Sequence, residues 1–219
     1  MAAITWDAAG TRRFETGDNN GVLYLQDAQG AYTTGVAWNG LTAVTESPSG
    51  ADPTDLYADD IKYATLRSTE TYGCTIEAYT YPDEFAECDG SAEIATGVKI
   101  GQQPRKTFGF SYCSTIGDDV DPNRGYKLHL IYGCTASPSD KSYQTVNESP
   151  DAITFSWEIT TVPVSVTGHK ATASIEIDST KADAAKLTAL KTILYGSENT
   201  DPRLPLPNEV AQLMGASSN

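Results

Sequence analysis

The residue pattern that most resembles a binding site is Asp119, Asp121 and Asn123. Their spacing at every second position matches the start of a calcium-binding loop. The pattern fails further on, because an EF-hand needs glycine where Arg124 stands and a bidentate glutamate where Leu130 stands. The segment also separates two strand-like stretches, whereas an EF-hand loop joins two helices. A turn between strands is therefore the favoured interpretation.

Carboxylates cluster a second time at Asp83, Glu84, Glu87 and Asp89, which could supply an acid and a base. A glycosidase holds two such groups roughly 5 to 10 Å apart in a cleft, and nothing in the sequence marks a cleft here. His129 could act as a general base, but no nucleophile motif such as Gly-x-Ser-x-Gly accompanies it. We therefore predict a solvated acidic turn, a polar sheet face around the histidine, and no enzymatic activity.

The cysteines lack the closely spaced pairs of a zinc site, so neither a metal nor another cofactor is expected. The first residues show no signal-peptide pattern, which favours a cytoplasmic origin and free thiols. Cys74, Cys113 and Cys134 lie in strand-like segments and are predicted to be buried. Cys88 lies in a short acidic turn and is predicted to be partly exposed.

The composition is that of a soluble globular chain of 219 residues with 29 acidic and 15 basic side chains, a net charge of −14. This balance disfavours a tight nucleic-acid binder, because neutralising phosphates requires Lys and Arg. The charge could equally serve only to keep the monomer soluble. No apolar run approaches the roughly 20 residues of a membrane helix, so no membrane is expected among the partners.

The elements that must position these side chains are mostly strands. Alternation of apolar and polar residues predicts strands at 22–26, 32–45 with a turn at 39–40, 61–68, 72–79, 106–115, 126–134, 153–160 and 172–178. The clearest case is 153–160, where the side chains expected on the buried face are Ile153, Phe155, Trp157 and Ile159. A mainly β fold follows.

Two helical segments are expected besides the strands. Residues 82–87 should form one or two turns, with Pro82 at the first helical position. Residues 183–196 should form a longer helix that begins at the N-cap Asp183 and ends at Gly196. Its apolar stripe consists of Leu187, Leu190 and Leu194.

No repeat or linker divides the chain, so we expect one domain over residues 1–219. Within it we expect an N-terminal arm at 1–20 and a long loop at 47–57, where prolines and glycines interrupt the strand pattern. The three prolines Pro202, Pro205 and Pro207 predict an extended C-terminal tail over 197–219.

A resemblance to the major tail protein family of long non-contractile-tailed bacteriophages is carried by GVAWNGLTAVTESPSGADPTDLYADDIKY, TIEAYTYPDEFAECDGS, RKTFGFSYCSTIG, GYKLHLIYGCTASPS and ITFSWEITTVPVSVTG. It continues through IEIDSTKADAAKLTALKTILYG and RLPLPNEV, and covers the chain from about Gly35 to Val210. The first thirty residues are less distinctive.

The resemblance implies a tail-tube-type β-sandwich or half-barrel with a short flanking helix and a C-terminal helix. It implies a structural protein of the virion tail, made and assembled in the host bacterial cytoplasm, whose hexameric rings stack into a hollow tube for genome ejection. The implied partners are further copies of the chain and other tail proteins such as the tape measure, tail tip and tail terminator. DNA would be cargo that passes without sticking. Two alternatives stay open: a tube protein of a contractile injection or secretion device, and a soluble ligand-binding β-sandwich.

The resemblance also implies two sets of functional residues. A loop that reaches the neighbouring ring would comprise Pro48, Ser49, Gly50, Ala51, Asp52, Pro53, Thr54, Asp55, Leu56 and Tyr57. The sheet that lines the lumen would use residues 36–45, 61–68, 106–113 and 126–133. The residues expected to face that lumen are Asp60, Lys62, Thr107, Ser111, Lys127 and His129.

Overall fold

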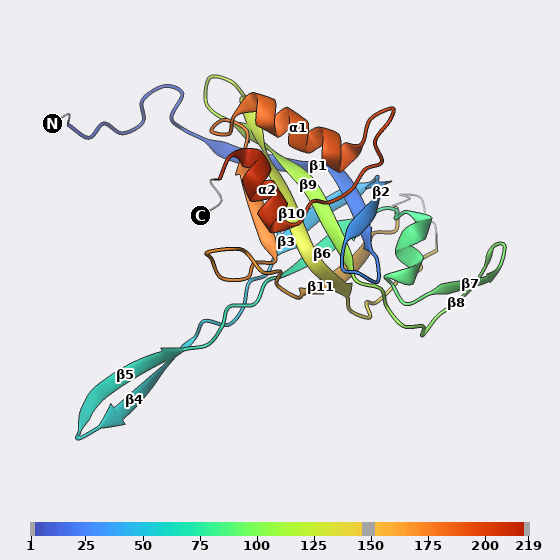
Figure 1. Cartoon of the computed structure of the whole chain (residues 1–219), viewed down its shortest axis with the longest axis horizontal. Helices are drawn as coiled ribbons and strands as arrows, with labels where there is room; N and C mark the ends of the chain where they lie inside the picture. The colour runs from blue at the N-terminus through green and yellow to red at the C-terminus, as the bar shows by residue number, and fades with distance from the viewer. Residues whose placement is uncertain (1–2, 146–151, 217–219) are drawn as a thin grey trace.

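The computed structural model describes residues 3–145 and 152–216. Within these residues the chain is mainly β, with one large antiparallel sheet, two small hairpins and two α-helices (Figure 1). The elements are β1 Phe14–Gln26, β2 Tyr32–Trp38, β3 Leu41–Glu46, β4 Pro53–Ala58, β5 Ile61–Arg67, β6 Gly73–Ala78, the 3-10 helix η1 Asp83–Glu87, β7 Ala92–Ala95, β8 Val98–Ile100, β9 Phe108–Gly117, β10 Gly125–Ala136, β11 Phe155–Thr161, β12 Ser174–Asp178, α1 Ala184–Tyr195 and α2 Pro207–Met214. The predicted fold class is confirmed.

The large sheet curls until its two ends come together. Its strand order is β2-β1-β9-β10-β11-β6-β3, with β12 beside β10. The end strands β2 and β3 are nevertheless joined by only Asn39 and Gly40, and β3 contacts β1. The approach is close: a Cβ at Gly21 of β1 would lie 2.3 Å from Leu41 of β3. The sheet is therefore a half-barrel with an inside and an outside.

The inside of the curl is filled by an aromatic inner core. Trp38, Phe85 and Trp157 meet there with ring centroids 4.5 to 5.5 Å apart, within the range of favourable aromatic pairs. The predicted alternation is confirmed for Trp157 and Ile159, which are buried in β11, and wrong for Ile153, which lies before the strand and is exposed. Phe85 reaches this core from η1, and the same packing buries Cys88 completely. The predicted exposure of Cys88 is wrong for that reason.

The outside of the curl is covered by α1 and α2 (Figure 1), which together with the sheet enclose an outer core. The predicted helix is confirmed: Asp183 accepts hydrogen bonds of 3.0 Å from the N–H groups of Ala185 and Lys186. The predicted stripe of Leu187, Leu190 and Leu194 is buried against β10 side chains such as Leu128 and Leu130.

The predicted extended tail is wrong over residues 207–214, which form α2. Pro207 stands in the first turn of this helix, where its missing N–H costs no hydrogen bond. Residues 202–204 do run extended, along the outer edge of β2. There Gly35 donates to the carbonyl of Pro202 at 2.9 Å, and Leu204 donates to that of Tyr32 at 3.1 Å. This edge strand is therefore covered.

A β-bulge at Gly133 changes the side of the sheet to which successive side chains of β10 point. Leu130 and Tyr132 belong to the outer core, and strict alternation would place Cys134 there too. Gly133 instead has φ +62°, and the pairing with β9 shifts register between Ile131 and Cys134. Cys134 consequently belongs to the inner core. Only glycine adopts this conformation at little cost.

The N-terminal arm is shorter than predicted, because β1 already begins at Phe14. Residues 14–20 pair with β9, and only residues 3–13 of the described chain precede the strand. The predicted ranges 1–20 and 197–219 also include residues 1–2 and 217–219, which lie outside the described residues.

Candidate functional site

The most conspicuous feature is a hairpin that projects far from the curled sheet (Figure 1). It consists of β4 and β5, which pair with each other from Pro53↔Arg67 to Ala58↔Ile61 and form a sheet of their own. We call residues 53–67 the projecting hairpin. The predicted loop is therefore wrong for residues 53–57, which form β4, and the strand predicted at 61–68 is confirmed but does not join the large sheet.

The tip of the hairpin is a two-residue turn at Asp59 and Asp60, with φ of 50° and 60°. Aspartate is one of the few residues besides glycine that tolerates the left-handed conformation that such turns require. Behind the tip, Asp55 accepts from Lys62 and Thr65, each at 2.8 Å. These two hydrogen bonds hold the pKa of Asp55 below its usual value. The hairpin thus has local sources of order but no core of its own.

Large apolar side chains on the hairpin are exposed. Their exposed fractions are 41% for Leu56, 72% for Tyr57, 63% for Ile61, 73% for Tyr63 and 57% for Leu66. A two-stranded hairpin alone is at best marginally stable in water, and several large exposed apolar side chains gathered on one small element favour an interaction surface. The chemistry that this element offers is contact with another macromolecule.

The remaining residues of the predicted loop form the neck of the hairpin. Ser49 and Thr71 exchange two backbone hydrogen bonds of 2.8 Å, and their hydroxyls share a third of the same length. Gly50 and Ala51 follow with φ of 88° and 57°. The two legs of the neck are therefore joined to each other at this point, and Gly50 and Ala51 change the chain direction directly beyond it.

The residues predicted to face a lumen do not share one surface. Asp60 and Lys62 lie on the projecting hairpin, and Thr107 lies half-buried just before β9. Ser111 is buried under α1, where its hydroxyl hydrogen-bonds that of Tyr24 at 3.3 Å. The exposure predicted for Ser111 is therefore wrong, whereas a lumen role for the other five stays a prediction.

Lys127 and His129, the last two of these residues, lie on the inner side of β10 within a polar cluster. The His129 ring stacks on Tyr112 with centroids 4.4 Å apart, and its Nε2 is 3.1 Å from the Ser114 hydroxyl. Tyr112 donates to Glu46 at 3.1 Å. Burial lowers the pKa of His129 despite the nearby Glu46 carboxylate, so the neutral ring is favoured. Lys127 pairs with Glu15 and Glu176.

This cluster is a set of polar contacts between strands β1, β3, β9, β10 and β12. The Ser114 hydroxyl shares a hydrogen bond with the histidine ring, whose Nδ1 is 3.7 Å from the Glu46 carboxylate. In the described part of the chain, no group of three or more His, Cys, Asp or Glu side chains is placed to hold a metal ion. The arrangement joins neighbouring strands through polar contacts.

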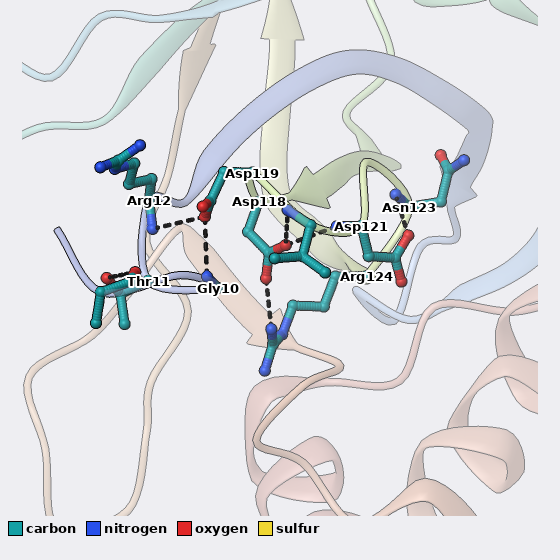
Figure 2. Close-up of polar contacts among 10 residues, drawn as sticks. Gly10, Thr11, Arg12, Asp118, Asp119, Asp121, Asn123 and Arg124 are labelled. Atoms are coloured by element: carbon teal, nitrogen blue, oxygen red, sulfur yellow. Dashed lines mark hydrogen bonds and ion pairs between the residues drawn. The ribbon is translucent and has the colours of Figure 1, made fainter.

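The segment with calcium-loop spacing forms the predicted turn between β9 and β10 (Figure 2). Sequence reasoning missed its central residue, Asp118, whose carboxylate accepts from the backbone of Val120 at 2.9 Å and of Asp121 at 2.7 Å, and also from Arg124. These contacts lower the pKa of Asp118 to about 2. Asp119 accepts from the Gly10 N–H at 3.0 Å and so fastens the N-terminal segment to the turn.

Three of the acidic residues in and beside η1, Asp83, Glu87 and Asp89, have separate cationic partners. Asp83 pairs with Lys99 at 2.9 Å and is largely exposed, as predicted. Asp89 pairs with Arg105 and Lys141, and its side chain is only 7% exposed. The prediction of a solvated turn is thus correct for Asp83 and wrong for Asp89, which ties η1 to the neighbouring segments.

The chain was compared with protein-family models and with curated protein sequences. No protein-family model matches it, and no curated protein sequence does either. In the described residues, neither α-helix has the length and apolar character needed to cross a bilayer. The projecting hairpin is therefore the candidate functional site on its geometry alone.

Proposed function

We propose that this chain is a structural subunit of a bacteriophage tail tube that assembles with copies of itself into stacked hexameric rings around a conduit for the genome. The observation that carries the proposal is the projecting hairpin, which exposes five large apolar side chains and extends away from an otherwise well-packed fold. The sequence resemblance described above supplies the identity of the assembly. The hairpin is the part of the chain that would reach the neighbouring ring.

The packing of the curled sheet supports a conduit between subunits rather than through one. Its interior is occupied by Trp38, Phe85 and Trp157, all buried, so nothing can pass along it. A sheet of about eight strands that closes on itself has room only for its own side chains. A channel wide enough for a duplex therefore requires strands pooled from several copies.

The charge of the chain is compatible with DNA as transient cargo. A net charge of −14 leaves too few Lys and Arg side chains for many phosphate contacts. Ion pairs within the fold engage most of the cations that exist, such as Arg105 with Asp89 and Arg203 with Glu209. Assembled tubes should accordingly bind duplex DNA weakly and without sequence preference.

Removing the projecting hairpin tests the proposal. We would replace residues 52–68 with a short Gly/Ser turn and compare the variant with the intact chain by mass photometry and negative-stain microscopy. The intact protein should form rings or tubes at high concentration or with a tail-tip nucleus. The variant should still unfold cooperatively and stay monomeric, because the hairpin side chains belong to neither core among the described residues.

A point-variant pair controls for the size of this deletion. Tyr63 on the hairpin and Tyr143 on the body are equally exposed, at 73%. Tyr63→Ser should raise the concentration needed for assembly, whereas Tyr143→Ser should not. Monomers of the intact chain under every condition, together with specific binding of a soluble ligand, would instead favour the binding-module alternative. Tubes formed by the hairpin-deleted variant would remove the hairpin from the mechanism.

A further inference from the structure

A second apolar surface lies on the opposite side of the fold from the inner core, between β12 and α2. It is a groove of about 510 Å³, within the roughly 300–1,000 Å³ typical of binding pockets. Its lining is mostly apolar and includes Val166, Ile175, Ile177, Val210 and Met214. Ile175 and Met214 are only partly buried by the fold itself. The groove therefore offers apolar area that a partner could cover.

The charges beside the groove are unevenly neutralised. The acids are engaged: Glu176 pairs with Lys127 at 3.1 Å, and Asp178 pairs with Lys181 at 2.9 Å. Lys170 lies in the loop that contributes Val166 and Thr172, and Lys186 reaches the carbonyl of Met214 at 3.3 Å. Within the described residues, neither Lys170 nor Lys186 has an acidic partner. Lys170 and Lys186 therefore add positive charge beside the groove that no acid of the described residues pairs with.

The tip of the projecting hairpin is complementary to this groove. It carries Asp59 and Asp60, for which the described residues provide no cation within ion-pair distance. Directly behind them lie exposed Tyr57 and Ile61. The hairpin points away from the sheet and from α2 of its own chain (Figure 1), so the two surfaces meet only between molecules.

We infer that the projecting hairpin of one copy docks in the β12–α2 groove of a second copy, with its apolar side chains in the groove and its aspartates beside Lys170 and Lys186. This inference rests on the proposed function and adds to it the surface that receives the hairpin. The two surfaces are different parts of the same molecule, so the contact is heterologous and continues from copy to copy until it closes or forms a filament.

The contact should be weak for one pair of molecules and strong for an assembly. A two-stranded tip in one groove covers less area than the roughly 1,200 Å² at which stable interfaces begin. Several such contacts between two rings act together and raise the effective affinity by avidity. Free monomers should therefore show no measurable dimer at concentrations where preformed tubes persist.

Site-directed crosslinking tests the location. We would assemble an equimolar mixture of Tyr57→Cys and Ala211→Cys proteins and oxidise it mildly; Ala211 lines the groove. The four native cysteines are buried, so the background should be low. A disulfide-linked dimer should appear on a non-reducing gel only after assembly. The matched control pairs Ala211→Cys with Ile94→Cys, because Ile94 is exposed to 63% on the other hairpin, β7–β8, and should give at least tenfold less dimer.

Neutralising the tip tests the electrostatic part. Asp59→Asn with Asp60→Asn removes both charges while keeping residues that tolerate the left-handed turn. This variant, and Lys170→Gln with Lys186→Gln, should each assemble with weaker dependence on salt than the parent. Tubes without the Tyr57–Ala211 crosslink, or with unchanged salt dependence in both variants, would overturn the inference and leave the proposed function standing. Failure of the parent to assemble at all would overturn both.

Discussion

Gly133 is the position at which one methyl group should do most damage to the fold. Its φ is +62°, and a Cβ there would lie 2.2 Å from the carbonyl oxygen of Val162, a backbone atom that cannot rotate away. An alanine in the left-handed conformation costs about 1–2 kcal/mol. Forcing the adjacent backbone apart adds the usual cost of overpacking, about 1–3 kcal/mol. We expect Gly133→Ala to lower the free energy of unfolding by about 2–5 kcal/mol.

Gly17→Ala is the matched control for this prediction. Gly17 lies in β1 with φ +64°, and a Cβ added there would meet no atom within 4 Å. It should show the conformational cost alone, about 1–2 kcal/mol. Urea unfolding followed by the fluorescence of buried Trp38 and Trp157 would measure both variants. If Gly133→Ala costs no more than Gly17→Ala, the close contact with Val162 does not constrain the bulge and the reasoning fails.

Two further predictions concern ionisable groups. The pKa of Asp118 is lowered to about 2 from 3.8 by its hydrogen bonds, so its contribution to stability is present above pH 3.8 and is lost as the pH falls through about 2. Stability measured against pH should accordingly fall more steeply in that window for the parent than for Asp118→Asn, and parallel curves would contradict this. Burial raises the pKa of Cys74 and of Cys88 to about 12. The native chain should therefore leave all four thiols unreacted with a thiol reagent at neutral pH and expose all four in urea, whereas rapid labelling of Cys88 would contradict its position in the inner core.

The sequence predicts elements best where one face of a strand or helix is buried. Trp157 and Ile159 alternate with polar residues because β11 faces the inner core, and Leu187, Leu190 and Leu194 repeat because α1 lies on the sheet. Strand β4 lacks such a contrast, since every one of its residues is exposed. Its order comes from pairing with β5, which a search for buried faces cannot detect. Helix α2 was also missed, because the three prolines predicted an extended tail. Proline is equally compatible with the first turn of a helix, where Pro207 stands.

Predicting the site was harder because it depends on contacts between distant residues. Ser111 was predicted to be exposed because it is polar and alternates with aromatic residues. Its side chain is instead buried against Tyr24, which comes from another strand. Asp118 owes its central role to Arg124 and to turn geometry that spacing alone does not reveal. Prolines and glycines predicted a long loop at 47–57, alternation predicted the strand at 61–68, and the family resemblance gave the loop its role in contact with the neighbouring ring. Strand β4, the pairing of β4 with β5 and the exposed apolar side chains emerged only from the fold. The β12–α2 groove forms from segments for which the sequence predicted a strand and an extended tail.

The strand order also determines which strand pairings can form while the chain is still being synthesised. Leu25 of β1 pairs with Phe108 of β9, and synthesis of the intervening chain takes on the order of ten seconds at bacterial rates. During that interval the edge of β1 that later pairs with β9 has no partner, while the projecting hairpin needs only its own turn, and a hairpin forms within about ten microseconds. The projecting hairpin can therefore pair its two strands before the sheet that carries it is complete, although on its own it is at best marginally stable. Mutual repulsion between acidic nascent chains would protect neighbouring ones on a polysome from joining too early.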